Sequence, residues 1–267
     1  MPKANTTHRK VLHMCLFIGA LLLLWQGVYF LCVDVLGIWK AYAVPSPWGV
    51  ILSLIDVASG SVLAIAVFRS LQRLIVGFAI STGLGFLLGL LMARIGFFRE
   101  TLKPLVLGLQ TLPSICWVPF AILWYGLSDS AIIFVIIIGS MFSISLAIEN
   151  GINTVDPIYI RAAKTMGTGS GALWTRVILP AAMPSLVVGM KQGWSFSWRS
   201  LMAGEMMFSS VGLGQILMMG RDLADINRVM AIMIVIILIG TLMDRLVFGT
   251  WEKSIRKARG LDRDDPK

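Results

Sequence analysis

Charged residues are scarce in this 267-residue sequence, where they make up 14% of the chain. About a quarter is usual in soluble globular domains. Hydrophobic residues make up 57%, and the mean hydropathy is +0.83. This composition excludes an ordinary soluble domain and indicates a polytopic membrane protein, whose chain crosses the bilayer several times.

Histidine and cysteine are equally scarce. The two histidines are His8 and His13, and the three cysteines, Cys15, Cys32 and Cys116, lie in or beside apolar runs. No His, Cys or carboxylate cluster has the spacing of metal ligands, and a Ser-His-Asp site would depend on His13. An odd number of cysteines also gives no disulfide framework. We therefore predict no metal site and no enzymatic activity in this chain.

A nucleotide-binding loop of the Gly-x4-Gly-Lys-Ser/Thr type is missing too. The glycine-rich segment 167–171 lacks the lysine and follows no predicted strand, so we interpret it as a hinge and expect no cofactor in this chain. The net charge of +9 does not indicate nucleic-acid binding, because the basic residues lie in short flanks of apolar runs rather than on one face.

The sequence does have six apolar runs, each long enough to cross roughly 30 Å of hydrocarbon at about 1.5 Å per residue. They cover residues 12–33, 74–92, 104–124, 130–148, 184–203 and 229–248. Trp48, Ile51, Leu52 and Ile55 recur at helical spacing and predict a short helix at the membrane interface. We predict an all-α fold with six transmembrane helices.

Three regions follow from these runs. Residues 1–71 hold the first transmembrane helix and an extracytoplasmic interfacial segment, and residues 72–250 hold a five-helix core with a loop at 156–180. Residues 251–267 form a basic tail that we expect in the cytoplasm.

Lysine and arginine are distributed unevenly about these spans. Of the 23, 16 lie on the side that holds both termini and the loop at 156–180, and 5 lie on the opposite side. The other two, Lys191 and Arg199, lie within the fifth run. Because cytoplasmic loops carry the excess of basic residues, both termini and this loop are predicted to be cytoplasmic.

The second run carries a small residue at every fourth position: Gly77, Ser81, Gly85 and Gly89. Small residues on one face allow another helix to approach closely, so this face predicts a packing seam. In the third run, Pro113 and Pro119 predict a kinked or broken helix. Residues 110–119 then form either a wall of a pathway or a purely structural kink.

Between the fourth and fifth runs, Asp156 and Pro157 are suited to begin a helix, and Gly167 is suited to end one. These signals predict a short helix over 157–166 that protrudes from the bundle.

This stretch resembles the cytoplasmic loop of binding-protein-dependent ABC importer permeases. The family pattern is Glu-Ala-Ala, three residues, Gly, nine residues, Ile, one residue, Leu-Pro. The positions that keep the spacing are Ala162, Ala163, Gly167, Leu179 and Pro180. Arg161 stands where the family has Glu, and Val177 stands where it has Ile. The alternative is an ordinary cytoplasmic loop.

The resemblance implies a type I importer fold in the cell inner membrane, with residues 156–180 as the coupling loop. In that family the loop docks in a groove of a cytoplasmic ATPase subunit, which binds the ATP and magnesium. It also implies an extracytoplasmic solute-binding protein and a second permease copy, which we expect to be identical. Asp156 and Arg161 would then belong to the contact with the ATPase.

The resemblance is greatest to the aliphatic sulfonate, nitrate and taurine branch of these permeases. The segments that carry it are Gln110-Thr111-Leu112-Pro113, residues 119–126, Ala203-Gly204-Glu205 and Gly212-Leu213-Gly214.

The fifth run holds the most informative polar set. At about 100° per residue, one face collects Lys191, Trp194, Trp198, Met202 and Glu205, with Arg199 about 80° from Lys191. Because charges in the membrane are costly, Lys191 and Arg199 are hypothesised to line the translocation path together with Gln110. Trp194 and Trp198 would form constriction walls. Glu205 would be a gate-side partner or a contact for the binding protein.

An alternative stays open for the two basic residues. Lys191 would extend to the cytoplasmic side, and Arg199 would pair with an acidic residue of a neighbouring helix. An anionic substrate follows only from the first interpretation.

A self-contained secondary transporter or channel is the alternative function. It would need acidic residues at mid-membrane for ion coupling, and usually internal repeats. The acidic residues here cluster at the ends of the spans, and no convincing repeat is present. A membrane enzyme would need a polar catalytic cluster that the sequence lacks.

Overall fold

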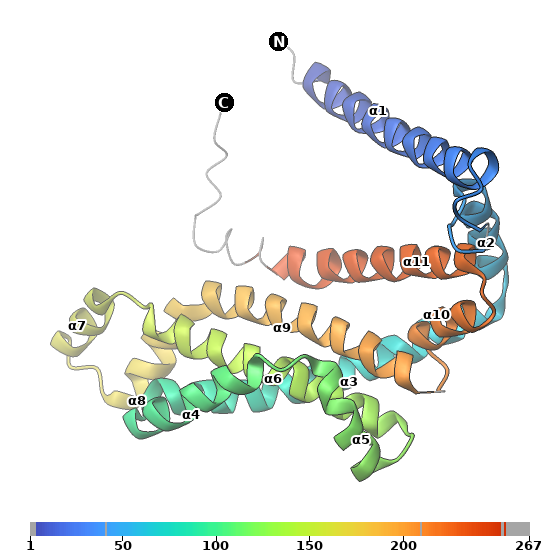
Figure 1. Ribbon diagram of the computed structural model, residues 1–267. Helices are drawn as coiled ribbons and strands as arrows, with labels where there is room; N and C mark the ends of the chain where they lie inside the picture. The colour runs from blue at the N-terminus through green and yellow to red at the C-terminus, as the bar shows by residue number, and fades with distance from the viewer. Residues whose placement is uncertain (1–3, 41, 209, 252–253, 255–267) are drawn as a thin grey trace. The chain divides into compact units, whose positions relative to one another are not determined.

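The computed structural model describes residues 4–40, 42–208, 210–251 and 254, and within these ranges it contains helices and no strand (Figure 1). Five of the described helical segments are long and apolar enough to cross a membrane, and a bent pair of shorter helices makes a sixth candidate. The predicted all-α membrane fold is confirmed.

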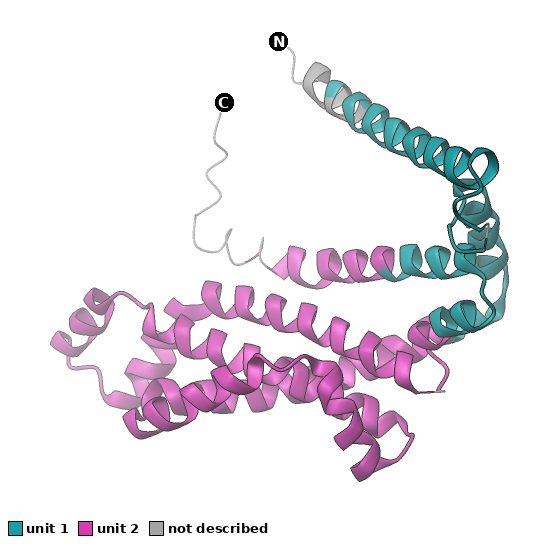
Figure 2. Cartoon of the chain, viewed as in Figure 1, with its two compact units in different colours: residues 1–65, 216–236 teal, residues 66–215, 237–267 magenta. Residues whose placement is uncertain are grey.

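The chain divides into two compact units (Figure 2). Unit 1 comprises residues 1–65 and 216–236, and unit 2 comprises residues 66–215 and 237–267. The three regions predicted from the sequence stay a prediction, and residues 252–253 and 255–267 of the predicted tail lie outside the described residues.

In unit 1, α1 (Ala4–Tyr29) continues into a π-helical turn (Phe30–Val35) and presents its apolar side chains outward, as a helix in contact with lipid does. The short helix predicted around Trp48 is α2 (Pro47–Ser59). Ser46 caps it, since its Oγ accepts the Gly49 N–H at 3.0 Å. The Ser46 N–H donates to Asn227 Oδ1 at 2.9 Å, which fixes the start of α2 to the first turn of α11 (Ile226–Asp244).

Unit 2 is built around α6 (Asp129–Asn153), which lies beside α9 (Leu179–Met207) (Figure 1). The small-residue face of α3 (Ser61–Arg94) packs against α6. Its glycines face successive isoleucines of α6, and a Cβ built on Gly85 would lie 2.8 Å from Cγ2 of Ile144. The predicted packing seam is confirmed.

The third span is broken, as the prolines predict. Helix α4 (Gly96–Gln110) ends before Pro113, and the chain resumes as a 3-10 turn (Ser114–Trp117) and α5 (Val118–Tyr125), with a bend of 100° between the two halves. Pro119 lies in the first turn of α5, where its missing N–H costs no helical hydrogen bond, so it begins a helix rather than kinking one.

Several helices extend beyond the apolar runs that predict them. Helix α3 begins thirteen residues before its run, α4 begins at Gly96 with Pro104 in its interior, and α9 begins at Leu179 with Pro184 in its interior. The remaining helices of the described chain are α7 (Pro157–Thr165), α8 (Ser170–Leu173), a π-helical turn (Trp174–Ile178), α10 (Leu213–Asp222) and a π-helical turn (Arg245–Gly249).

Candidate functional site

Helix α7 has the caps that its sequence predicts. The Asp156 carboxylate accepts the Ile158 N–H at 2.8 Å, and Pro157 occupies the first helical position. Gly167 follows the helix with a φ of +75°, a left-handed conformation that other residues adopt at a cost. The helix ends at Thr165, one residue before the predicted end.

One side of α7 packs into the core of unit 2. Ala163, only 3% exposed, belongs to a buried apolar cluster shared with α6 and α9. The cluster also contains Ile144, Ile148, Ile152, Val155, Leu173, Ile178, Ala182 and Leu186. Ala163 therefore joins α7 to α6 and α9 through a close-packed apolar contact.

The rest of the α7 surface is exposed and of mixed chemistry. Ile158 and Tyr159 are 57% and 59% exposed, and Arg161 and Ala162 are exposed as well. Met166, just after the helix, is 78% exposed. The helix lies beyond the ends of α6 and α9 (Figure 1). Leu179 and Pro180 are further back, in the first turn of α9.

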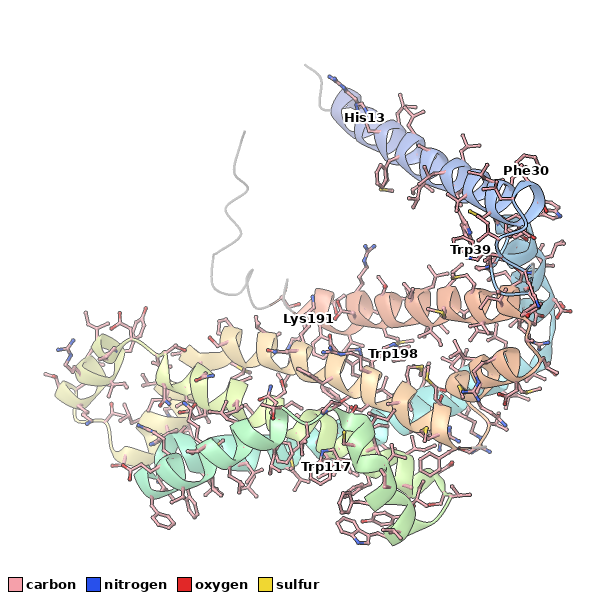
Figure 3. All side chains as sticks on the ribbon, in the orientation of Figure 1. His13, Phe30, Trp39, Trp117, Lys191 and Trp198 are labelled. Atoms are coloured by element: carbon pink, nitrogen blue, oxygen red, sulfur yellow. The ribbon has the colours of Figure 1, made fainter. Side chains whose placement is uncertain are left out.

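The residues predicted to line a pathway separate into two groups. Lys191 and Trp198 project from α9 toward α11 (Figure 3). The Lys191 Nζ lies 3.3 Å from Asp244 Oδ2, and Trp198 contacts α11 at Gly240. Trp194 is 5% exposed and packs edge-on against Phe78, with ring centroids 5.1 Å apart. These three side chains are packed against neighbouring helices.

Arg199 and Gln110, in contrast, are brought together. They line a cavity of about 300 Å³ between the break in the third span, α6 and α9. The other residues around it are Thr111, Leu112, Pro113, Ser114, Gly139, Phe196 and Ser200. The Arg199 guanidinium stacks over the Phe196 ring at 4.4 Å, and its Nε donates to the Ser195 carbonyl at 3.3 Å.

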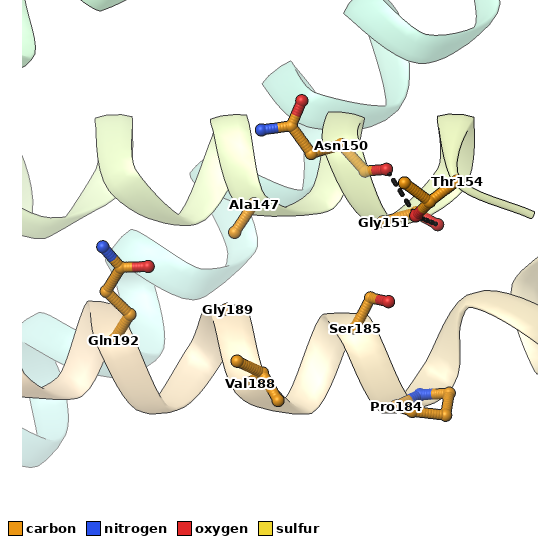
Figure 4. Close-up of a pocket in the computed structure, with 9 residues that line it drawn as sticks. All are labelled: Ala147, Asn150, Gly151, Thr154, Pro184, Ser185, Val188, Gly189 and Gln192. Carbon is orange, nitrogen blue, oxygen red and sulfur yellow. Dashed lines mark hydrogen bonds between the residues drawn. The ribbon is translucent and has the colours of Figure 1, made fainter.

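A second hollow lies on the same two helices, nearer the loop at 156–180 (Figure 4). This groove of about 420 Å³ has Asn150 and Thr154 of α6 and Ser185 and Gln192 of α9 among its lining residues. Asn150 and Gln192 are exposed in the single chain. Polar side chains therefore follow the α6–α9 seam from the loop end to Arg199.

Glu205 lies at the centre of a buried polar cluster and is not exposed at all. The Ser70 Oγ lies 2.8 Å from both of its carboxylate oxygens, Arg73 Nη1 donates to it at 2.7 Å, and the Gly214 N–H donates to it at 3.0 Å. Arg73 also pairs with Asp129 at 2.8 Å. The carboxylate thus joins α3, α9 and the start of α10, while Arg73 extends the cluster to α6.

Ser128 is the N-cap residue of α6, and Asp129 lies in the first turn, where it binds Arg73. Two further charged residues received no role from the sequence. Glu149 is fully buried, and Lys103 Nζ binds it at 2.8 Å. The sequence does contain a signal for this pair. Glu149 lies in the last turns of an apolar helix, where an acidic side chain requires a partner.

Among the described residues, no group of three or more His, Cys, Asp or Glu could hold a metal ion.

Comparisons with known proteins agree with this architecture. The family described as binding-protein-dependent transport system inner membrane component matches residues 81–248. An ABC transporter permease protein of Methanocaldococcus jannaschii is 34% identical over 177 residues, 66% of each chain. A Bacillus subtilis protein named as an aliphatic sulfonates transport permease is 29% identical and covers 86% of this chain and 81% of its own. The nitrate import permease protein of a Synechocystis species is 28% identical, over 69% of this chain and 67% of its own.

A solved structure of the MetNI methionine ABC transporter in an inward-facing conformation has a similar fold. The TM-score is 0.62 at 19% identity, over 73% of this chain and 96% of the other. At 19% identity, this similarity shows a shared fold and nothing more. With the family match covering most of unit 2, the chain belongs to the binding-protein-dependent inner membrane components and is a multi-pass permease subunit of an ABC importer.

Proposed function

We propose that this chain forms half of the membrane channel of an importer for a small oxyanion such as a sulfonate or nitrate. An extracytoplasmic binding protein delivers the solute, and cytoplasmic ATPase subunits supply the free energy through the coupling loop. ATP and magnesium are bound by those subunits and not by this chain. Two relatives named for aliphatic sulfonates and nitrate support the substrate class.

The observation that carries the proposal is that α7 has both a buried contact and an exposed apolar surface. Ile158 and Tyr159 of the helix, and Met166 just after it, are exposed, which suits an apolar groove on a partner protein. The helix packs through Ala163 into the cluster shared with α6 and α9. When two ATPase subunits close on ATP, movement of α7 would rotate these helices and shift the population from inward-facing to outward-facing states.

A second copy of the chain is supported by the polar side chains along the α6–α9 seam. Gln192 and Arg199 are exposed in the single chain, although both lie within the fifth apolar run, in a helix that is long and apolar enough to cross a membrane. Polar and charged groups facing lipid cost several kcal/mol, at roughly 2.5–3.5 kcal/mol for an arginine at the helix centre on insertion scales. A two-fold axis at this seam would place them along a water-filled path between identical copies.

The anionic substrate rests on Arg199 more than on Lys191. Asp244 neutralises the charge of Lys191 locally, whereas Arg199 lines a cavity with uncharged polar neighbours. Trp194 and Trp198 pack against helices, so Gln110 and Arg199 are the better candidates for the pathway. We assign Glu205 to holding the cluster around Arg73 rather than to contact with the binding protein, because it is fully buried.

Uptake into proteoliposomes tests this function. The permease, co-purified with its ATPase subunits and supplied with its binding protein, should accumulate radiolabelled ethanesulfonate or nitrate when ATP is present. Robust uptake by the permease alone under an ion gradient would instead indicate the self-contained transporter.

The variant Tyr159→Glu places a charge on the exposed apolar surface of α7 and should abolish co-purification of the ATPase subunits and ATP-driven uptake. The matched control is Leu127→Glu, which makes the same kind of change at a residue 70% exposed at the other end of α6. Leu127→Glu should retain the ATPase subunits. Equal retention by both variants would show that α7 is not the docking element.

A further inference from the structure

We infer that the cavity between the break in the third span, Gly139 and Arg199 is an oxyanion-binding subsite within the membrane. The inference rests on the proposed import function and identifies where the anion binds during its passage. The cavity residues come from the end of α4, the 3-10 turn, α6 and α9, so the site forms only when these elements pack together.

The first argument is uncompensated charge. No acidic residue lines the cavity, and within the described part of the chain Arg199 forms no ion pair. Three other basic side chains of unit 2 differ, because each pairs with a carboxylate: Lys191 with Asp244, Arg73 with Glu205 and Lys103 with Glu149. An arginine presents a planar set of donors that matches two oxygens of a carboxylate, phosphate or similar anion. Stacking on Phe196 holds this plane in one orientation.

The second argument is the chemistry of the other lining groups. Ser200 is 1% exposed, and its Oγ has no hydrogen-bond partner within the described structure. Buried hydroxyl groups are normally bonded, so an unpartnered one beside a cavity is suited to a ligand oxygen. Gln110 and Ser114 offer further donors. The Thr111 hydroxyl already donates to the Gly108 carbonyl at 2.6 Å and is left as an acceptor only.

The third argument is space and depth. Gly139 forms the floor, where a Cβ would collide with the Ser200 hydroxyl and lie 3.1 Å from the Ser114 Cβ. A volume of about 300 Å³ admits nitrate or a short alkyl sulfonate together with water. Gly139 lies roughly 15 Å along α6 from Asp129, at about 1.5 Å per residue, which is near the middle of the bilayer. A broken helix is tolerated at that depth where it faces protein or a water-filled path.

Equilibrium binding tests the subsite independently of transport. The permease–ATPase complex in nanodiscs, without binding protein or nucleotide, should bind radiolabelled ethanesulfonate. Nitrate should compete, and ethyl methyl sulfone, which is similar in shape but uncharged, should not. Arg199→Gln should weaken ethanesulfonate binding at least about tenfold, since a hydrogen bond to a charged group contributes that much. Ser200→Ala should weaken it about threefold, because it removes one hydrogen bond and keeps the charge of Arg199.

Arg245→Gln is the matched control, because it removes one exposed basic side chain of unit 2 away from the cavity and should leave binding unchanged. If Arg199→Gln fails to assemble, Ser200→Ala decides the question, since it keeps the charge. Three results would overturn the subsite: no binding by the wild type, binding by Arg199→Gln and Ser200→Ala as tight as that of the wild type, or competition by the sulfone. In that case ATP-driven uptake by the wild type would still support the proposed function. If the wild type binds ethanesulfonate and Arg199→Gln does not, but the wild type shows no ATP-driven uptake, only the proposed function is contradicted.

Discussion

Glu205 and Glu149 are fully buried and bound by basic side chains, while Arg199 has a cavity beside it and no ion-pair partner among the described residues. Removing one member of a buried pair leaves an uncompensated charge, which is far more costly than losing an exposed pair. At the residue scale, the paired charges therefore hold helices together, and the unpaired arginine is available to a solute.

Glu205→Gln keeps the size of the side chain but turns an amide donor toward Arg73 or removes the acceptor that Gly214 uses. We expect the free energy of unfolding to fall by about 3–5 kcal/mol, as when one partner of a buried ion pair is removed. Thermal unfolding of the permease–ATPase complex in detergent, followed by size-exclusion fluorescence, measures the change.

The control is Asp222→Asn, which breaks the Arg221–Asp222 pair, where both side chains are 65% exposed. A change of about 0–1 kcal/mol is expected there, because water screens an exposed pair. If Glu205→Gln is no more destabilising than Asp222→Asn, the cluster around Arg73 does not stabilise the fold.

The sequence predicts that charges within the fifth span need partners, but not which partners they have. By that rule Lys191 and Arg199 are equivalent, and only the packing of α9 shows Lys191 beside Asp244 and Arg199 beside Gln110. Trp194 was predicted to form a wall of the pathway, which requires its face of α9 to point toward that pathway. In the structure the Trp194 ring packs against Phe78 of α3 instead. Helical periodicity gives the angle between side chains and not the helix that each side chain meets.

At the scale of elements, local signals predict helix ends where a cap or a proline fixes the backbone. Asp156, Pro157 and Gly167 define α7 to within one residue, because capping bonds and a left-handed glycine act locally. The apolar runs predict where the long helices lie, but the predicted lengths are too short. The helices continue through polar residues beyond the apolar runs. Pro184 does not end α9, which shows that tertiary packing overrides a local breaker.

The packing seam between α3 and α6 gives a prediction at this scale. Gly85→Leu would place a side chain where Cγ2 of Ile144 and the Met141 carbonyl already lie, at 2.8 and 2.9 Å from a Cβ. Because backbone blocks one side, the helices must separate, and we expect a loss of stability of roughly 3 kcal/mol, at the upper end of ordinary overpacking. A lower unfolding temperature and a lower yield of monodisperse complex would report it.

Gly83→Leu is the matched control, two residues away on the same helix, where a Cβ would meet nothing within 4 Å. Its unfolding temperature should equal that of the wild type. Equal effects of the two leucines would mean that the loss arises from helix propensity or insertion and not from the seam.

At the scale of the whole molecule, hydropathy and the loop motif suffice to predict the class of protein, because span number and motif spacing are properties of the linear chain. The pathway is different. It depends on which side chains stay exposed within the spans, such as Gln192 and Arg199, and therefore on contacts between residues distant in sequence. The proposed two-fold arrangement follows from the cost of leaving these groups in lipid.

Membrane orientation is the property on which the role of α7 finally depends. The test uses a background in which serine replaces Cys15, Cys32 and Cys116. In this background Leu127→Cys places a single thiol just before α6, and Gly171→Cys places one in the loop that follows α6. Since 16 of 23 basic residues lie on the side of Gly171, that side should be cytoplasmic. A membrane-impermeant maleimide should label Leu127→Cys in intact spheroplasts and Gly171→Cys only after permeabilisation. Labelling of Gly171→Cys from outside would place α7 beyond the reach of cytoplasmic ATPase subunits, and the proposed coupling would be wrong.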